Sequence, residues 1–435
     1  MLYSPRHCHD LIVRPASWGV RLLGRFILFL VLLIVAAGQV AGQELELANV
    51  VLQEPAGLPR SNEYVELALP AGSGAAADSA RMIYAIEEST AQVIPCQAFD
   101  RRIGADGKRA GVSIIFPISL QANERKSLKI MTGRATRSAE RRVTDLRSQG
   151  NALELRVEND FYQADLTSNT QTEGKKHHSG QLRELFLKLG FAQRLSRQEN
   201  RMHWAPNFQK RGLQEYKTIA HWDTPKLCTL EKGPYLIQTA REDFAPGHPE
   251  ILLSATYSFY AGMPFFTFVS TMSVVQDLWL ELLRNDEMTM DSLFTHVAFQ
   301  RPDGEVVDLA FSTRYEVLDR RPIDDDAPWL CFYHHAKGYA FGSIRLRYDN
   351  TNDAGAASPL FHPHTKISDG AGGGKYWNRR LVDERATFIP KGSRYAEENA
   401  YLVFRIEASD RFATIKYWSD RLRHPIRVNV IAGER

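Results

Sequence analysis

Three groups of residues in this 435-residue sequence carry side chains that can bind a carboxylate and transfer protons. They are Arg284, Glu287 and His296; the pair His334 and His335; and Tyr376 with Arg379. Arginine binds a carboxylate through its planar fork, and histidine or tyrosine can act as base or acid. Together these side chains match the needs of β-elimination on a uronate-containing glycan: a neutraliser for the carboxylate, a base for the C5 proton and an acid for the leaving oxygen.

Each of these residues also has a purely structural interpretation. On a strand, His296 can be a half-buried, hydrogen-bonded histidine, and Glu287 can be a solvated turn carboxylate. His334 and His335 point to opposite faces if the chain is extended, so at most one of them can face a given site.

Tryptophan stands beside histidine twice in the polar, proline-rich segment 197–250, as His203-Trp204 and His221-Trp222. The face of an indole ring matches the apolar face of a pyranose, which makes Trp204, His221 and Trp222 candidates for sugar binding. The alternative is that the tryptophans pin a loop to a sheet. Prolines at this density predict long loops that join strands, and such loops often carry binding residues.

The run that follows the glycine-rich loop 369–374 adds Trp377 and Arg380 as candidates for substrate binding. Tyr376 and Trp377 can form a stacking platform for a sugar or belong to the core. Arg379 and Arg380 can hold a ligand carboxylate or form surface ion pairs with nearby acidic residues.

Hydrolysis would need two carboxylates across one cleft. Asp286, Glu287, Glu397 and Glu398 are available, but their spacing does not indicate a pair.

No motif predicts a metal or an organic cofactor. His362 and His364 lack a third ligand at a diagnostic spacing, and the glycine-rich loop lacks the ending of a phosphate loop. Asp349 to Asp353 is similar to a calcium loop but out of register with it, so the competing interpretation is an ordinary Asx turn.

The stretch 251–299 supplies the scaffold for these groups. Apolar residues alternate through Ile251, Leu253, Ala255, Tyr257 and Phe259, which is the period of a strand with one buried face. The alternation resumes after a turn at 262–264, as in a hairpin, and two more strands follow.

The first 42 residues have the organisation of a secretory signal peptide. Four arginines precede the apolar run 26–37, and small residues follow at 40–42. An uncleaved membrane anchor is the alternative, although the run is shorter than the roughly 20 residues that span a bilayer. Cleavage would make the protein periplasmic or secreted, with no membrane association afterwards.

The charge of the chain indicates which classes of partner to expect, and its cysteines indicate whether a disulfide can form. Residues 1–42 hold four arginines and one aspartate, so the remainder of the chain is formally neutral. Nucleic acid is therefore not expected as a partner, because phosphate binding needs uncompensated positive charge. Cys96, Cys228 and Cys331 are expected as small buried residues, with a Cys228–Cys331 bridge left open. The sequence carries no signal of an oligomeric state.

The remaining pattern predicts an all-β protein. Short strands over 43–132 indicate a small β-sandwich or barrel, and 133–150 is an interdomain linker or a solvated helix. A large antiparallel β domain then fills 151–435, with a bulge near Asn159 and a strand over 182–191. A single helix is expected near the C-terminus, where Phe412, Ile415, Trp418 and Leu422 share a face after a cap at Ser409 or Asp410.

The segments ENDFYQADL, YSFYAGMPFFTF and PKGSRYAEENAYL of the large domain resemble the galactose-mutarotase-like β-supersandwich of carbohydrate-active proteins. The resemblance covers about residues 150–435 and implies a large antiparallel supersandwich, as found in many polysaccharide lyases, glycosidase accessory domains and sugar epimerases. Lyases with this fold usually carry a helical toroid as well, and no amphipathic helical array is present in this sequence.

Two functions are consistent with these observations. The first is an exported protein that binds an acidic polysaccharide or oligosaccharide and cleaves it by β-elimination at the concave face of the large sheet. The second is a non-catalytic glycan-binding or cell-envelope structural protein.

Overall fold

The computed structural model describes residues 44–69, 82–100, 112–133, 143–166, 169–170, 176–177, 179–196, 202–290, 293–370 and 373–431. The fold is all-β, with 57% strand and 6% helix, as the sequence predicted. The predicted signal peptide, 1–42, lies outside the described residues, as do residues 134–142 of the predicted linker. None of the described helices is long and apolar enough to cross a membrane.

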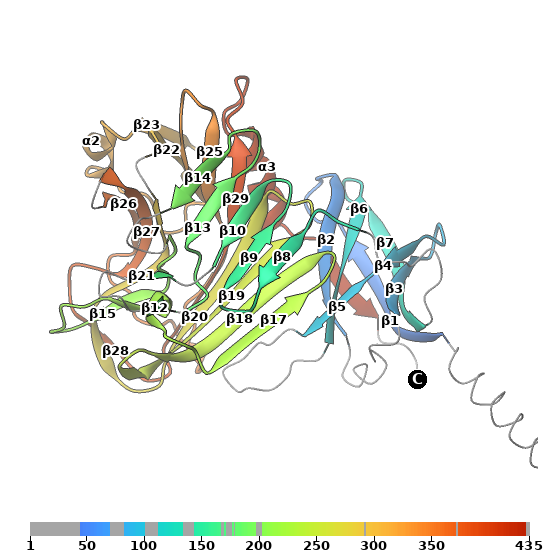
Figure 1. Cartoon of the computed structure of the whole chain (residues 1–435), viewed down its shortest axis with the longest axis horizontal. Coiled ribbons are helices and arrows are strands. Elements are labelled where there is room, and N and C mark those ends of the chain that lie inside the picture. The colour runs from blue at the N-terminus through green and yellow to red at the C-terminus, as the bar shows by residue number, and fades with distance from the viewer. Residues whose placement is uncertain are drawn as a thin grey trace, which may run out of the picture.

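The N-terminal strands form a small sandwich of two sheets around an aliphatic core (Figure 1). The first sheet has the order β30 (Arg427–Ile431), β1 (Leu45–Gln53), β7 (Arg125–Gly133), β3 (Met82–Glu87) and β4 (Val93–Pro95). The second has the order β2 (Arg60–Ala68), β6 (Val112–Leu120) and β5 (Gln97–Asp100). The last strand of the chain therefore pairs with the first one, antiparallel, through 427–431 against 49–53.

The large domain is built on a nine-stranded antiparallel sheet. Its order is β17 (Leu227–Lys232), β18 (Leu236–Ala245), β19 (His248–Tyr260), β20 (Phe265–Val274), β29 (Arg394–Arg405), β25 (Tyr339–Asp349), β24 (Trp329–Tyr333), β22 (His296–Gln300) and β23 (Val306–Ala310). The predicted hairpin of 251–274 is confirmed as β19 and β20, which pair from Ile251 with Val274 to Phe259 with Phe266.

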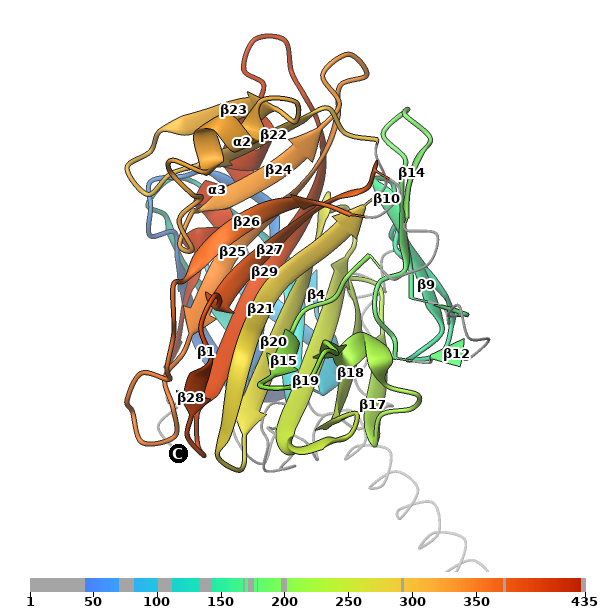
Figure 2. The same ribbon diagram turned by 90° about the vertical axis from the view of Figure 1, so that its left-hand side faces the viewer.

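Two smaller sheets share one core with the nine-stranded sheet. The six-stranded sheet has the order β16 (Lys217–Thr218), β15 (Asn207–Lys210), β21 (Leu278–Met290), β27 (Lys375–Val382) and β26 (His364–Asp369), with β28 (Thr387–Ile389) also paired to β21. The five-stranded sheet has the order β14 (Gln193–Ser196), β13 (Glu184–Leu187), β10 (Tyr162–Asp165), β9 (Leu155–Glu158) and β8 (Arg147–Gly150). Figure 2 shows β21, β27 and β26 on the side of the molecule that faces the viewer. A two-stranded pair, β11 (Asn169–Thr170) and β12 (Lys176–His177), completes the sheets of the described residues.

Three local predictions differ from the structure. The register shift at Asn159 is a turn between β9 and β10, not a bulge, because Glu158 pairs with Gln163 across it. Segment 197–250 is not mainly loop, since it contains β17 and β18 and the start of β19. Segment 306–317, where an all-β protein would continue as a strand, contains β23 and then the helix α2 (Arg314–Leu318).

Hydrogen bonds at the Asn159 turn connect two of the segments that resemble galactose-mutarotase-like proteins, ENDFYQADL and YSFYAGMPFFTF. The Asn159 amide nitrogen donates to the carbonyl oxygens of Tyr260 and Met263, at 3.1 and 2.8 Å. The Tyr162 hydroxyl donates to the carbonyl oxygen of Phe265 at 3.2 Å. The five-stranded sheet is thereby held to the β19–β20 hairpin by buried hydrogen bonds, which are costly to break.

The predicted C-terminal helix is confirmed as α3 (Ala413–Arg423), with Phe412 and Ile415 buried and Trp418 and Leu422 packed on the same core. Asp410 accepts a hydrogen bond from the backbone N–H of Phe412 at 3.1 Å, just before the helix begins.

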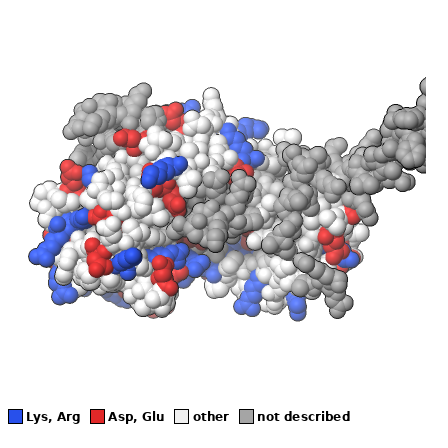
Figure 3. Space-filling view, turned by 90° about the horizontal axis from the view of Figure 1, so that it is seen from below, with Lys and Arg blue, Asp and Glu red and all other residues white. Residues whose placement is uncertain are grey.

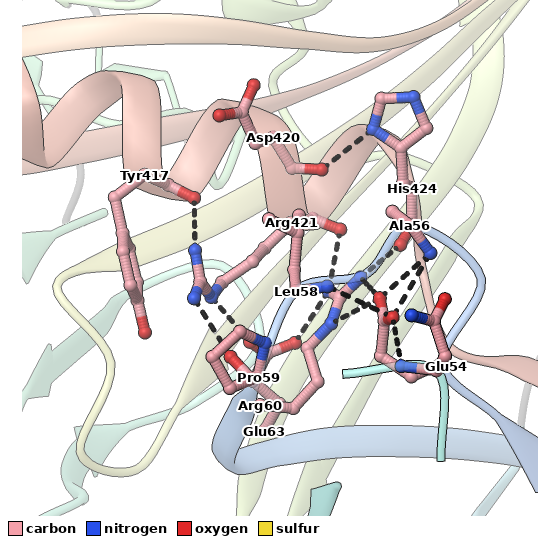
Figure 4. Close-up of polar contacts among 11 residues, drawn as sticks. Glu54, Ala56, Leu58, Pro59, Arg60, Glu63, Tyr417, Asp420, Arg421 and His424 are labelled. Carbon is pink, nitrogen blue, oxygen red and sulfur yellow. Dashed lines mark hydrogen bonds and ion pairs between the residues drawn. The ribbon is translucent and has the colours of Figure 1, made fainter. Parts of the chain in front are cut away.

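The end of α3 is joined to the small domain by a buried ionic network (Figure 4). Arg60 pairs with Glu54 at 2.7 Å and donates to the carbonyl oxygens of Arg421 and His424, at 3.1 and 2.7 Å. Arg421 in turn donates to the carbonyl oxygen of Pro59 and pairs with Glu63 at 3.3 Å. The guanidinium of Arg60 therefore donates to carbonyl groups at the helix end, where intrahelical donors become scarce.

The three cysteines are free: Cys331 is buried as predicted, Cys228 is exposed and Cys96 is half-buried. The disulfide left open in the sequence is not formed.

Candidate functional site

A β-bulge in the middle of β21 places Asn285 and Asp286 on the same inner face, so that Glu287 lies on the same face of the six-stranded sheet as Arg284. Asn285 pairs with Arg379 and Met288 with Trp377, so β21 has one residue more than β27 between these pairs. Asp286 sits in the bulge with φ at 45°, a left-handed conformation that aspartate tolerates better than most residues. Asp286 points into the core between the sheets, and Glu287 points away from it.

We call the face of the six-stranded sheet that is turned away from the nine-stranded sheet the outer face. Arg284 of β21 lies opposite Arg380 of β27, and Arg380 lies opposite His364 of β26. On the other side, Arg284 lies opposite Asn207 of β15. Residues directly opposite one another share a face, so these four side chains form a polar row across four strands.

Glu287 is the buried acid of this row. Its carboxylate accepts from the Asn207 amide at 3.2 Å and lies 3.5 Å from the Arg284 guanidinium. Burial raises the pKa of Glu287, and the positive charges of Arg284 and Arg380 offset that rise in part. The Arg284 guanidinium also lies over the ring of Tyr216, 4.9 Å from its centroid.

Trp204 and His221 border the row. The backbone N–H of Trp204 donates to the carbonyl of Glu287 at 3.0 Å, so the segment before β15 runs beside the bulge. The indole of Trp204 meets the imidazole of His221 edge-on, with the ring centroids 5.5 Å apart. His221 ends the short 3-10 helix η3 (Ile219–His221), whose first turn is capped by Thr218.

The far end of the row is an ion pair. Arg380 binds both oxygens of Asp383 at 2.6 Å, and His364 lies 3.9 Å from the same carboxylate. Tyr376 lies on the outer face as well, since it alternates with Asn378 and Arg380 along β27 and stands opposite Ser368 of β26. The outer face thus combines two arginines, two carboxylates, imidazoles and aromatic rings. In the view of Figure 3, basic and acidic side chains are mixed over the large domain.

The inner side of the bulge is a polar network within the core. Asp286 accepts hydrogen bonds from Trp377, Tyr401 and Ser343 at 3.0, 3.0 and 2.8 Å, and its backbone N–H donates to Glu397 at 2.7 Å. Burial raises the pKa of Asp286, against the charge of Arg345. Burial and the negative charge of Asp286 raise the pKa of Glu397 to about 8.

A chain of hydroxyl and imidazole groups extends this network to β19. The Tyr401 hydroxyl gives its proton to Asp286, so it accepts at 3.1 Å from Nε2–H of His203. His203 Nδ1 then accepts from the hydroxyl of Tyr257 at 2.6 Å. Burial lowers the pKa of His203 to about 3, which keeps it neutral.

Several polar atoms beside Glu397 have no hydrogen-bond partner within the described part of the chain. They are Glu397 Oε2, Asn399 Oδ1, Asn285 Oδ1, Arg345 Nε and Arg379 Nη1. Donors and acceptors are mixed in this set, as is usual where ordered water fills a polar interior.

The outer face brings together half of the predicted site residues. Those on or beside it are Arg284, Glu287, Tyr376, Arg380, Trp204 and His221.

Three predicted site residues lie in the core instead. Trp377 is fully buried against Phe332, with centroids 4.8 Å apart, because it alternates with Tyr376 and so faces inward. Arg379 faces inward too, pairing with Asp325 at 3.0 Å and lying over the ring of Tyr348. Trp222 is buried, and its indole N–H donates to the carbonyl oxygen of Phe244 at 2.8 Å. It therefore pins a loop to a sheet, which was the alternative interpretation of this residue.

The other three predicted residues form a separate cluster on the nine-stranded sheet. His296 stacks on Tyr333 with centroids 5.0 Å apart, and His335 is 5.2 Å from His296. His334 accepts from the backbone N–H of Lys337 in the turn after β24. Burial lowers the pKa values of His296 and His334.

Sequence reasoning missed Asn207 and Tyr216, and considered His364 only as a metal ligand. Strand pairing is what joins Asn207 and His364 to the arginines, and the sequence contains no direct signal of that pairing. Asp286 and Glu397 were considered only as separate hydrolytic carboxylates, whereas a 2.7 Å hydrogen bond links them.

Among the residues that the structure describes, no group of three His, Cys, Asp or Glu side chains could hold a metal ion. The segment at Asp349 contains Asx turns, because Asp349 accepts from the N–H of Thr351 and Asn352 accepts from that of Ala354.

The comparisons with known proteins concern the fold. No protein-family model matches the chain, and no curated protein matches its sequence. An alpha-mannosidase from Enterococcus faecalis V583 has a similar structure, with a TM-score of 0.50 and 11% identity over 88% of this chain and 46% of that one. A protein in the Glycosyl Hydrolase Family 38 from Enterococcus faecalis gives 0.47 and 12% over 88% and 47%.

A galactose mutarotase-like protein from Lactobacillus casei ATCC 334 is also similar, with a TM-score of 0.32 and 9% identity over 60% of this chain and all of that one. A galactose mutarotase-like protein, the class that the sequence resembles, is thus among the structures found by comparison. This chain spans about half the length of the two glycoside hydrolase structures.

Proposed function

We propose that the outer face of the six-stranded sheet binds an acidic polysaccharide or oligosaccharide and cleaves it by β-elimination. The observation that carries the proposal is the pairing of Arg284 with Arg380 across β21 and β27, beside the buried acid Glu287. Two adjacent guanidinium groups suit a ligand carboxylate, and the alpha-mannosidase of similar fold is named for a sugar substrate.

The reaction has three requirements. Arg284 and Arg380 neutralise the carboxylate of a uronate, which acidifies its C5 proton. His221 takes that proton, and the electron pair of the C5–H bond forms a C4=C5 double bond as the C4–O bond breaks. Glu287, whose raised pKa favours the protonated form, gives its proton to the leaving oxygen.

A non-catalytic glycan-binding protein is the second candidate, and one observation favours it. Arg284 is already paired with Glu287, and Arg380 with Asp383. A ligand carboxylate must therefore compete with a carboxylate of the protein at each arginine. A face of this kind can bind a glycan weakly and reversibly without turning it over. Under either proposal the segment 1–42 directs export to the periplasm or the medium.

The test measures turnover and binding separately. Purified protein is mixed with a panel of polyuronates, the ultraviolet absorbance of the unsaturated product is followed, and binding is measured by calorimetry. We expect Arg284→Ala to abolish both signals and Arg347→Ala, which removes a 71% exposed arginine on β25, to change neither. Binding without absorbance rejects elimination in favour of the second candidate, and absence of binding rejects both.

A further inference from the structure

An exposed aromatic pair lies on the outer face, away from the polar row. Trp279 is 45% exposed and stands directly opposite Phe388, which is 43% exposed, with the ring centroids 5.5 Å apart. Arg211 lies over the indole, 5.5 Å from its centroid. Of the six tryptophans that the structure describes, Trp279 is the one that is strongly exposed.

Trp279 shares both its strand and its face with Arg284. Leu278 and Leu280, its neighbours in β21, are buried in the core between the sheets, so Trp279 points outward. Trp279 and Arg284 are five positions apart, about 16 Å at the rise of a strand, and they share a face because the register of β21 against β15 shifts between them. In Figure 2, β21 runs along the length of the sheet, with β28 beside its first residues.

One loop connects the two places. Segment 211–216, between β15 and β16, begins with Arg211 over the Trp279 ring and ends with Tyr216 over Arg284. Tyr216 is 44% exposed and contacts Arg284 of the polar row. The outer face therefore carries aromatic rings paired with guanidinium groups at both ends of this loop.

We propose that Trp279, Phe388 and Arg211 form a second subsite that binds a pyranose ring of the same glycan, away from the reacting unit. The proposal rests on the proposed function. The indole and phenyl faces cover the apolar face of the sugar, and Arg211 binds a uronate carboxylate. A ligand contacts this subsite when it is long enough to reach from Arg284 to Trp279. The subsite therefore makes the protein select ligands by chain length.

The experiment compares short and long ligands. The probes are uronate oligosaccharides of graded length, from a disaccharide to a chain that reaches from Arg284 to Trp279, with binding measured by calorimetry on the whole protein. We expect Trp279→Ala to weaken binding of the long oligosaccharide about tenfold and to leave the disaccharide affinity unchanged. Long ligands, but not short ones, are expected to protect Trp279 from quenching by acrylamide, and Trp279→Phe is expected to restore most of the affinity.

The control is Tyr315→Ala. Tyr315 is 44% exposed and has Arg314 over its ring at 3.9 Å, so it matches Trp279 in exposure and in its cation, but it lies on α2. An equal loss in both variants, or unchanged long-chain affinity in Trp279→Ala, overturns the subsite. If Arg284→Ala still abolishes binding in that case, the proposed function stands. A wild-type protein that binds neither ligand overturns both.

Discussion

Arg284 and Glu287 are three positions apart in β21, yet their side chains meet on the outer face of the six-stranded sheet, 3.5 Å apart. The bulge makes this contact possible, because it turns Asp286 into the core on the same side as Asn285. Asp286 is held in the core by three side-chain donors, and its own backbone N–H is held by Glu397. The orientation of Glu287 on the outer face therefore depends on a network on the other side of the sheet.

Asp286→Ala is expected to lower the free energy of unfolding by about 3–5 kcal/mol, because it leaves buried donors on Trp377, Tyr401 and Ser343 without an acceptor. Asp286→Asn keeps one oxygen and is expected to cost less. Asp286→Gly serves as the control, since it suits the positive φ but also removes the acceptor. Denaturant unfolding measures all three, and a glycine variant as stable as wild type would contradict the role of the hydrogen bonds.

Glu397→Gln tests the acidic pair through pH. Because the pKa of Glu397 is raised to about 8, the folded state binds more protons than the unfolded state between pH 4.5 and about 8. Stability should fall as pH rises through this window, by at most about 1.4 kcal/mol per pH unit for one proton. Chemical denaturation at several pH values should show a flatter profile for Glu397→Gln than for wild type. An unchanged profile, or the same flattening in the neighbour Glu398→Gln, would argue against this assignment.

Glu287→Gln separates the two candidate functions. The substitution removes the carboxylate that competes for Arg284 and leaves that largely buried arginine without its charge partner, so uronate affinity should rise several-fold. If Glu287 is the acid, turnover is lost in the same variant, and the wild-type rate declines as pH rises through the raised pKa of Glu287. Calorimetry and product absorbance measure the two effects, with Glu281→Gln on the same strand as control. Weaker binding in Glu287→Gln would show that the carboxylate serves the ligand and not the arginine.

Arg60→Ala probes the junction of the two domains. It leaves Glu54 buried without its ion-pair partner, which typically costs about 3–5 kcal/mol. Burial alone would raise the pKa of Glu54, but hydrogen bonds from Arg60 and from backbone N–H groups lower it to about 2. This stabilisation is present above pH 4.5 and is lost as pH falls toward 2, and the loss should be smaller in Arg60→Ala.

The measurement for Arg60→Ala is denaturant unfolding at neutral and acidic pH. Lys129→Ala is the control, because Lys129 and Glu88 form an exposed pair on the same small domain and removing it should change little. Equal effects of the two variants would contradict the importance of the buried network.

Much of the fold was predictable because strand alternation is a local signal. The stretch 251–274 alternates on both sides of a single turn, and β19 and β20 follow this pattern. The prolines of 197–250 misled the interpretation since they flank strands: Pro234 stands between β17 and β18, and Pro246 between β18 and β19. A proline at the end of a hairpin does not interrupt the hydrogen bonds between the strands. The many prolines of this segment therefore indicated turns between strands.

The site was predictable in its residue types but not in its grouping. Arg284 and Glu287 are neighbours in sequence, whereas Arg380 joins them through the pairing of β21 with β27. The inward direction of Trp377 follows from a register that the sequence does not reveal, and the bulge at Asp286 reverses the alternation again. His296 was grouped with Arg284 and Glu287 because the strands that carry them follow one another in the chain, but β22 belongs to the nine-stranded sheet and β21 to the six-stranded one.

The pairing of β30 with β1 has a consequence for biosynthesis. β30, which completes the first sheet, is synthesised after every other described strand, so the small domain cannot complete this sheet until the large domain has been translated. Until then the exposed edge of β1 is open to other strands. Contacts such as Arg60 with the carbonyl of His424, separated by 364 positions, should also form late, since closing so long a loop is slow. A chaperone that guards the first strand of the emerging chain would act where this topology leaves the protein vulnerable.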